Sequence, residues 1–301
     1  MVSAELMPFF VVGAQRSGTT MLRLMLNSHS RIAVPFESAF LCQYPNLAQY
    51  GDLRNKSNAE TLLQALAEEP LTKKGKIIQE PKAILAEPIE TYSDLLTAIF
   101  QQYAHKRGKV RWGVKTPEYV TEIDQIWRLF PHCKIIHLIR DGRDVALSYR
   151  RISWGSSHTP RVAADWRWKV MLGHKMGEMI RVPYLSYLEV HYEDLVRSPE
   201  ATLSKVCAFV GERYEAQMLH YHQDGAREMP SESLQWHRTS VSAPDETKVL
   251  AWKREMPLAD QILFDEIAGD ALEQFGYERV RRAAPIRVAC KRVYYCLIRR
   301  W

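Results

Sequence analysis

Long apolar runs, paired cysteines and metal-ligand spacings are missing from this 301-residue sequence. No stretch approaches the roughly 18 apolar residues of a membrane-spanning helix, and no basic segment precedes the short apolar run near the start, as a secretory signal would require. The five cysteines form no CxxC pair, and the ten histidines form no HxxxH or HExxH spacing. These absences argue against a disulfide scaffold and the common zinc motifs, and we expect a cytoplasmic location.

An excess of positive charge is also missing outside the last residues. The net charge is +6, but residues 279–301 carry eight lysines and arginines and no acid, so residues 1–278 have a net charge of −2. We therefore expect a single domain over 1–278, a basic C-terminal helix or tail over 279–301, and no nucleic-acid partner. The tail alternates basic and apolar residues, which permits contact with an anionic membrane surface; we favour a helix docked on the domain.

Short apolar segments alternate with helix-like segments along most of the chain. The pattern predicts strands over residues 8–14, 31–35, 110–115, 134–139 and 186–192. It predicts helices over residues 19–29, 59–68, 92–106, 119–129, 141–151, 161–180, 194–210, 257–274 and 285–299. This order indicates a three-layer α/β/α fold with a mostly parallel central sheet. Residues 222–247 show no periodicity, and a loop of that length is typical of a lid over a site.

A glycine-rich turn follows the first predicted strand. The segment from Gly13 to Gly18 fits GxxxxG and leads into a predicted helix. Glycines allow the backbone to point its N–H groups inward, and the helix adds the positive end of its dipole, so the turn is suited to a phosphate-like group. A nucleotide triphosphatase would have lysine at position 19, whereas this chain has Thr19, and its nearest cation is Arg16.

The segment GAQRSGTTML resembles the 5′-phosphosulfate loop of the sulfotransferase family, and its RSGTT form is similar to the tyrosylprotein and bacterial members. These enzymes use 3′-phosphoadenosine-5′-phosphosulfate (PAPS) as the sulfuryl donor and release 3′-phosphoadenosine-5′-phosphate (PAP). The resemblance implies the sulfotransferase fold, which is of the P-loop nucleotide-hydrolase type. It also implies that the loop binds the donor through Arg16, Ser17, Gly18, Thr19 and Thr20.

A second motif lies in KIIHLIRDGRDVALSYRR. Arg140 ends a predicted buried strand and Ser148 lies two turns into the next helix, so both could hold one further phosphate. The segment resembles the family's 3′-phosphate motif, which implies this role for Arg140 and Ser148. Tyr192, in VHYEDLV, matches a tyrosine that lines the donor site in some members. We expect the two anion sites to lie about a nucleotide's length apart.

The remaining matches concern the reaction itself. Sulfuryl transfer requires a base for the acceptor and a cation near the leaving oxygen, but it does not require a metal. Glu37 follows the second predicted strand in AVPFESAF, and the resemblance implies that it is the base. Lys115 matches a family lysine and would stabilise the leaving group together with Arg16. Val114 stands where some relatives have Glu or Asn, so a second polar group is missing there.

Several alternatives stay open. A kinase-like phosphotransferase on the same fold would require a lysine at position 19 and an acidic strand end for Mg²⁺, and Thr19 and Arg140 oppose it. An inactive nucleotide-binding protein is a further alternative. A histidine base is the weaker hypothesis, because His137 lies within a predicted buried strand. The sequence does not define the oligomeric state or the acceptor, for which we expect a hydroxyl or amine on a small metabolite or lipid-like molecule.

Overall fold

A computed structural model describes residues 7–184 and 186–280 of the chain. Within these residues, five strands form one parallel sheet in the order β2-β3-β1-β4-β5. The strands are β1 (Phe9–Val12), β2 (Ile32–Ala33), β3 (Arg111–Lys115), β4 (Lys134–Ile139) and β5 (Tyr187–His191). The register pairs Phe10 with Val114 on one side and with Ile135 on the other. The predicted parallel α/β sheet is therefore confirmed.

Alternation along the central strand places helices on both faces of the sheet. Phe9 and Val11 pack against α1 (Thr19–Asn27) and α10 (Pro199–Val210), whereas Phe10 and Val12 pack against α5 (Tyr92–His105) and α6 (Ile123–Leu129). Successive side chains of a strand point to opposite faces of the sheet, so apolar side chains lie on both faces. Helices cover each face and bury these side chains. The three layers predicted from the sequence follow from this arrangement.

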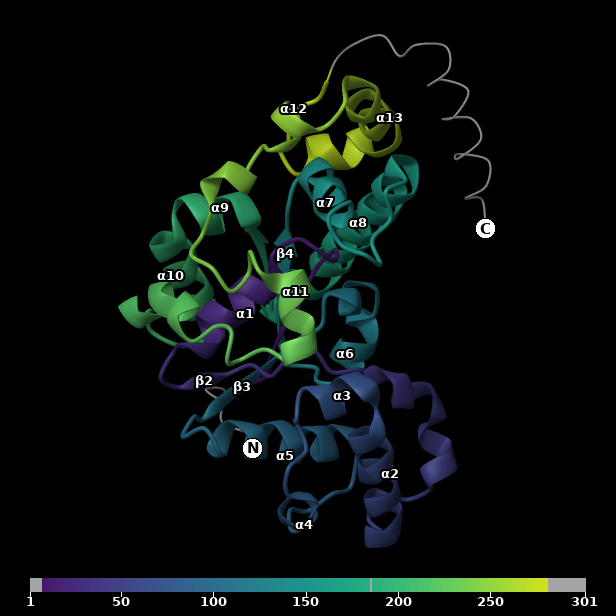
Figure 1. Cartoon of the computed structure of the whole chain (residues 1–301). Helices are drawn as coiled ribbons and strands as arrows, with labels where there is room; N and C mark the ends of the chain where they lie inside the picture. The colour runs from purple at the N-terminus through teal and green to yellow at the C-terminus, as the bar shows by residue number, and fades with distance from the viewer. Residues whose placement is uncertain (1–6, 185, 281–301) are drawn as a thin grey trace.

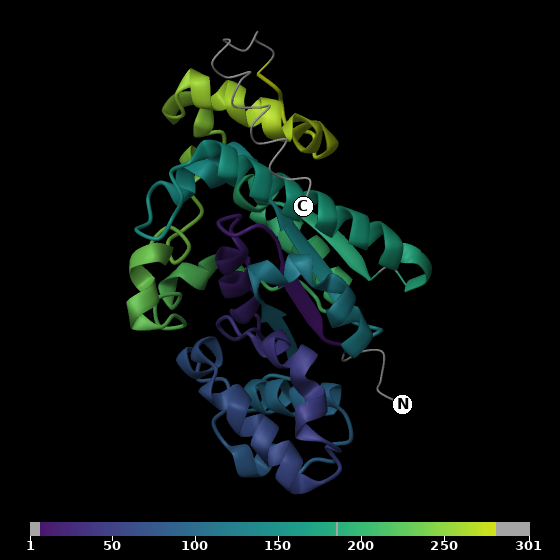
Figure 2. The same ribbon diagram turned by 90° about the vertical axis from the view of Figure 1, so that its right-hand side faces the viewer.

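Two further groups of helices lie at opposite ends of the molecule (Figures 1 and 2). At one end, α2 (Lys56–Glu68), α3 (Pro70–Lys74) and α4 (Pro81–Ile84) lie near α5. At the other end, α7 (Gly142–Tyr149), α8 (Thr159–Tyr184) and α13 (Leu258–Gln274) pack around Trp166 and Phe264. The short helix α3 lies outside the predicted helices; the side chain of Glu69 starts it by accepting the N–H groups of Leu71 and Thr72.

Two helix predictions differ from the structure. The helix expected over 194–210 is divided into α9 (Tyr192–Arg197) and α10, because Pro199 lacks an N–H and so starts a new helix. The helix expected over 119–129 is a 3₁₀ turn, Pro117–Thr121, followed by α6. The helix expected over 285–299, and most of the basic tail, lies outside the described residues. Within the described part, no helix is both long enough and apolar enough to cross a bilayer.

The sheet order determines where a ligand can bind. The chain leaves β1 for β2 and β3 on one side of the sheet and later adds β4 and β5 on the other. In parallel α/β sheets, a crevice opens at the carboxyl ends of the strands on either side of such a reversal. Gly13, Lys115 and Arg140 lie at or directly after the carboxyl ends of β1, β3 and β4. The fold thus brings the predicted site residues to one edge.

Candidate active site

The turn between β1 and α1 contains residues with positive φ angles. Gly18 has φ 95°, and a Cβ at this position would lie 2.4 Å from Cδ2 of Tyr192. Arg16 also adopts a positive φ of 68°, which is uncommon for a residue with a side chain. Gly13 donates its N–H to the carbonyl of Pro117 over 3.1 Å. The turn is thereby fixed against the sheet, and the free amides of the first turn of α1 are available to an anion.

Arg16 connects the two predicted anion motifs directly. Its Nε donates to Oγ of Ser148 over 3.1 Å, and its Nη2 donates to the carbonyl of Trp236 over 3.0 Å. Burial and the nearby charge of Arg140 lower the pKa of Arg16. The two motifs adjoin, because β1 and β4 are neighbours in the sheet. The expected spacing of the two anion sites, about a nucleotide's length, stays a prediction.

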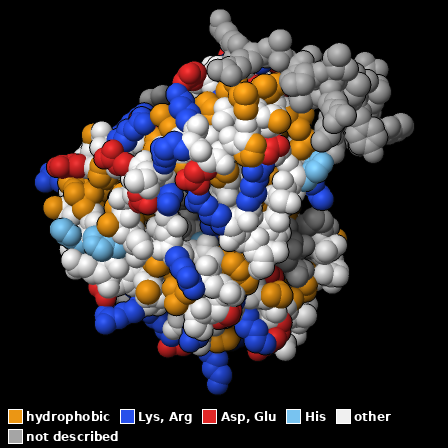
Figure 3. Space-filling model, turned by 45° about the horizontal axis from the view of Figure 1, so that its top comes forward, with side chains coloured by type: hydrophobic (Ala, Val, Ile, Leu, Met, Phe, Trp, Pro, Cys, Tyr) orange, Lys and Arg blue, Asp and Glu red, His pale blue; other side chains and the backbone are white. Residues whose placement is uncertain are grey.

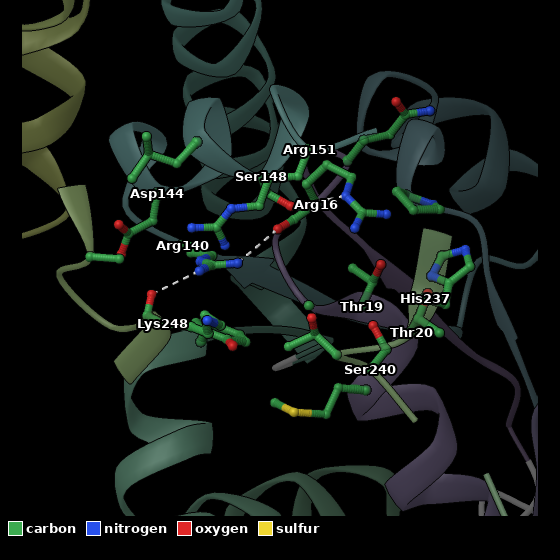
Figure 4. A pocket seen from close by; sticks show the side chains of 18 of the residues that line it. Arg16, Thr19, Thr20, Arg140, Asp144, Ser148, Arg151, His237, Ser240 and Lys248 are labelled. Carbon is green, nitrogen blue, oxygen red and sulfur yellow. Dashed lines mark hydrogen bonds between the residues drawn. The ribbon is translucent and has the colours of Figure 1, made fainter. Parts of the chain in front are cut away.

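Arg140 lies against the other side of the same turn. Its Nη1 donates to the carbonyl of Arg16 over 3.3 Å and its Nη2 to the carbonyl of Lys248 over 2.9 Å, as the dashed lines in Figure 4 show. The guanidinium lies over the ring of Tyr192, with its carbon 4.2 Å from the ring centre. Its Nε is buried and has no hydrogen-bond partner among the described residues. Because Arg140 has no carboxylate partner within 4.0 Å in that part of the chain, its charge is available to a ligand anion.

The helix after Arg140 is held by buried charges. Asp141 caps α7 by accepting the N–H of Arg143 over 2.9 Å. The fully buried guanidinium of Arg143 binds both oxygens of Asp141 and also reaches Asp265 of α13 at 3.3 Å. The N–H of Asp141 in turn binds Glu193 over 3.0 Å. These bonds fix the end of β4 and thus the position of Arg140.

Glu37 lines the cleft and contacts Lys115, which is fully buried. Nζ of Lys115 lies 2.5 Å from Oε1 of Glu37 and 3.3 Å from Oγ1 of Thr20. Burial alone would raise the pKa of Glu37, but the charge and hydrogen bond of Lys115 outweigh it and lower that pKa. Complete burial lowers the pKa of Lys115, and Glu37 opposes this effect. The predicted base and the predicted leaving-group cation are therefore brought together beside the phosphate-binding turn.

A segment with no sequence periodicity supplies a further wall. We call residues 216–248 the covering segment; it contains α11 (Leu234–His237) and short 3₁₀ turns in place of the loop expected over 222–247. His237, Thr239, Ser240 and Lys248 line the cleft. Burial and the charges of Lys115 and Arg16 lower the pKa of His237 to about 3, so its imidazole is neutral. The sequence predicted a lid here, but no motif marked His237 as part of the site.

The complete cleft joins these walls. It holds about 970 Å³ of empty space, part of it open to solvent. Figure 4 shows Arg16, Arg140 and Ser148 gathered on one side, and His237 and Ser240 on the other. On the face drawn in Figure 3, basic side chains gather near the centre with acidic ones among them. No cluster of three or more His, Cys, Asp or Glu side chains suited to a metal occurs in the part of the chain that the structure describes.

Burial also shifts the pKa of Asp144 and of His137. Burial raises the pKa of Asp144 to about 6; one oxygen accepts the N–H of Trp252 over 2.8 Å, and the other has no partner among residues 7–184 and 186–280. His137 is fully buried, and burial lowers its pKa to about 3. Its Nδ1 lies 2.6 Å from the hydroxyl of Tyr187, away from the cleft, which agrees with a packing role.

A parallel sheet with a glycine-rich turn and two cleft arginines at its carboxyl edge is typical of α/β proteins that bind anionic ligands. Comparison with known proteins identifies the family: the model described as "Sulfotransferase family" matches residues 8–216. The chain belongs to the sulfotransferase family, and its membership supports transferase activity. The predicted fold and family are thus confirmed.

Individual relatives are distant. A putative protein-tyrosine sulfotransferase of Caenorhabditis briggsae is 24% identical over 80% of this chain and 78% of its own length. The nodulation protein NoeE of Sinorhizobium fredii is 25% identical over 90% of this chain and 66% of its own length. The chain spans 27% of an uncharacterised Aquifex aeolicus protein that is 26% identical to it. The sulfotransferase domain of the Synechococcus PCC 7002 olefin synthase has a similar fold, with a TM-score of 0.61, 22% identity and coverage of 90% of this chain and 94% of that domain.

Proposed function

We propose that this protein transfers the sulfuryl group of PAPS to a hydroxyl or amine of a small-molecule acceptor and releases PAP. The observation that carries the proposal is the contact between Arg16 and Ser148, because it joins both implied donor motifs in one cleft that Glu37 also lines. Glu37 in turn is bonded to the fully buried Lys115. A donor with phosphates at its 3′ and 5′ positions fits such adjoining anion sites.

The donor-binding residues divide into two groups. The turn from Ser17 to Thr20 and the first amides of α1 would hold the 5′-phosphosulfate. Arg140 and Ser148 would hold the 3′-phosphate, since both residues line the cleft and the buried Nε of Arg140 has no hydrogen-bond partner among the described residues. The ring of Tyr192 lies under the guanidinium of Arg140 and beside Gly18, so Tyr192 would position both the 3′-phosphate residues and the 5′-phosphosulfate turn.

The reaction is an in-line displacement at sulfur. Glu37 accepts the acceptor's proton while the acceptor atom forms its bond to sulfur. The bond from sulfur to the bridging oxygen breaks, and PAP leaves with that electron pair. Lys115 and Arg16 stabilise the negative charge that develops on the leaving oxygen. Lys115 is suited to this role because it contacts both Glu37 and Thr20.

The outer part of the cleft favours an acceptor with an apolar or aromatic portion. Trp154 lines the cleft and is 49% exposed. Its ring lies edge-on to those of Tyr149 and Trp236, at centroid distances of 6.1 Å and 6.5 Å. Contact between such an aromatic surface and an apolar part of the acceptor would stabilise the complex, because it removes apolar area from water. A small metabolite or lipid-like alcohol or amine is therefore the acceptor class that we propose.

Ligand-dependent thermal stability tests the donor. We expect PAP to raise the melting temperature more than adenosine 5′-phosphate, because only PAP engages both anion sites. Mg·ATP should have a smaller effect, since Thr19 stands in the place of the lysine that binds β- and γ-phosphates. Stabilisation by Mg·ATP without stabilisation by PAP would favour a kinase-like phosphotransferase instead.

Product formation tests the reaction. The protein is incubated with ³⁵S-labelled PAPS and a cell extract, and products are sought by mass spectrometry as species heavier by one SO₃ group. The Glu37→Gln variant serves as the control for enzyme-dependent labelling. Labelling that is equal with the wild type and with this variant would contradict the proposed role of Glu37.

A further inference from the structure

Two residues on the inner face of α1 contact both the loop of Glu37 and the covering segment. Arg23 and Asn27 lie one helical turn apart, below the donor-binding turn that starts the same helix. Arg23 is 0% exposed and Asn27 is 6% exposed. Neither residue lines the cleft, so neither is placed to touch a ligand there.

Their first shared target is the peptide of Val34. Nη1 of Arg23 donates to the carbonyl of Val34 over 3.3 Å, and Oδ1 of Asn27 accepts the N–H of Val34 over 3.0 Å. Val34 follows β2 and precedes Glu37 by a few residues. Helix α1 therefore fixes the backbone from which the Glu37 carboxylate extends toward Lys115.

Their second shared target is Glu228 in the covering segment. Nη2 of Arg23 donates to the carbonyl of Glu228 over 2.9 Å, and it also lies 3.2 Å from Sδ of Met229. Nδ2 of Asn27 donates to Oε2 of Glu228 over 2.8 Å. The same two side chains thus hold the part of the covering segment that leads to α11 and His237.

A purely structural role would not require a charge at this place. Arg23 has no carboxylate partner within 4.0 Å among the described residues, and its Nε is buried without a hydrogen-bond partner. A buried guanidinium that binds only carbonyls and a sulfur costs stability relative to an apolar side chain. In return, the two side chains link α1, the segment after β2 and the covering segment, which are separate in the sequence.

We propose that Arg23 and Asn27 are positioning residues that hold Glu37 and the covering segment in their working places relative to the donor-binding turn. Donor bound at the start of α1 is thereby coupled to the wall that carries His237. This inference extends the proposed function but concerns contacts within the chain, so it can be tested without an acceptor. Arg23 is expected to act through Glu37 and the covering segment, not by touching the substrate.

Hydrogen–deuterium exchange of the covering segment tests the clamp in the full-length protein. Arg23→Met and Asn27→Ala remove two or three hydrogen bonds, so exchange of the amides in 228–240 should be about ten-fold faster or more than in the wild type. Arg227→Met is the matched control, because Arg227 is exposed and pairs only with Asp224 in the described structure. It should exchange at the wild-type rate. Unchanged exchange in both clamp variants would overturn the proposal.

Binding of PAP separates this result from a failure of the donor assignment. Calorimetry with PAP should give affinities within about three-fold of the wild type for Asn27→Ala, because the donor contacts are intact, while PAP no longer protects 228–240. If wild-type protein does not bind PAP, the donor assignment fails, whereas exchange without ligand still reports on the clamp.

Glu228 provides a second pair of variants should Arg23→Met fail to fold. Glu228→Ala removes the acceptor of Asn27 and should accelerate exchange in 228–240. Glu228→Gln retains an amide oxygen in the same place, so it should restore slow exchange. Fast exchange in Glu228→Gln, equal to that of Glu228→Ala, would contradict a clamp built on this hydrogen bond.

Discussion

Nε of Arg16 lies 3.1 Å from Oγ of Ser148, although 132 positions separate the two residues in the sequence. The contact means that one guanidinium spans both anion motifs. An incoming donor must share or displace it, and Arg16 also holds the carbonyl of Trp236 in the covering segment. Donor binding and the position of the covering segment are therefore linked through Arg16 as well.

Removal of the Ser148 hydroxyl should weaken PAP binding specifically. We expect Ser148→Ala to lower the affinity for PAP by about five- to ten-fold, the value of one hydrogen bond, with little effect on adenosine 5′-phosphate.

Arg140→Lys should lower the affinity for PAP by roughly 10- to 100-fold, because lysine cannot reproduce the planar guanidinium over Tyr192. Calorimetry with both nucleotides measures the difference. Arg150→Lys, which alters an arginine paired with Asp260, is the control, and an equal loss of both nucleotides would argue against a 3′-phosphate site.

Gly18→Ala should both destabilise the fold and abolish donor binding. Its φ of 95° is unfavourable for alanine, and the new Cβ would lie 2.4 Å from Tyr192. We expect a loss of about 2–4 kcal/mol in the free energy of unfolding, measured by urea denaturation. Gly108→Ala is the matched control, because Gly108 has φ 66° with no atom within 4 Å of the added Cβ. It should lose about 1 kcal/mol. Equal losses in the two variants would show that the contact with Tyr192 is unimportant.

Glu37→Gln should reduce turnover by about two to four orders of magnitude and leave PAP binding intact. The amide retains the shape of the side chain but cannot accept the acceptor's proton. Steady-state transfer from labelled PAPS and calorimetry with PAP measure the two effects. Glu118→Gln, which changes another partly buried carboxyl of this region, should retain most of the activity.

His237→Ala tests whether the histidine that lines the cleft takes part in proton transfer. Its imidazole has a lowered pKa of about 3, and it faces the cleft near Lys115 and Glu37. We expect a smaller loss of turnover than in Glu37→Gln, because His237 would contribute to acceptor placement and not to proton transfer. A loss in His237→Ala that exceeds that of Glu37→Gln would transfer the role of base to the histidine.

Asp144→Asn should stabilise the protein only at neutral and higher pH. Burial raises the pKa of Asp144 from its ordinary 3.8 to about 6, so the folded protein binds more protons than the unfolded chain between these values. Stability therefore falls as the pH rises through this window, by at most about 3 kcal/mol. The side-chain amide oxygen of the variant can still accept the N–H of Trp252 without this loss.

Urea denaturation at several pH values measures this effect. The difference between Asp144→Asn and the wild type should be near zero at about pH 4 and should reach its full size above about pH 7. Asp124→Asn, at an exposed position in α6, should show no such trend. A difference that is constant with pH would contradict a raised pKa of Asp144.

Local sequence patterns specify the chemical groups of the site and the elements on which they lie. Strand, turn and helix around Gly13 to Thr20 follow from apolar periodicity and glycine spacing, which are local properties of the chain. The same holds for Arg140 at the end of β4 and Ser148 on α7. For this reason the family, the fold and several of the residues that line the cleft could be predicted without coordinates.

Which of these groups come into contact depends on the packing of elements that are distant in the sequence. The adjacency of β1 and β4 places Arg16 against Ser148, and the position of β3 between β2 and β1 brings Lys115 to Glu37. Neither distance is encoded in a local pattern, because each depends on the order of strands in the sheet. The roles of Arg23 and His237 could not be predicted for a related reason. Arg23 contacts backbone carbonyls of remote segments, and His237 reaches the cleft from the covering segment. Such long-range contacts leave no periodic pattern in the sequence.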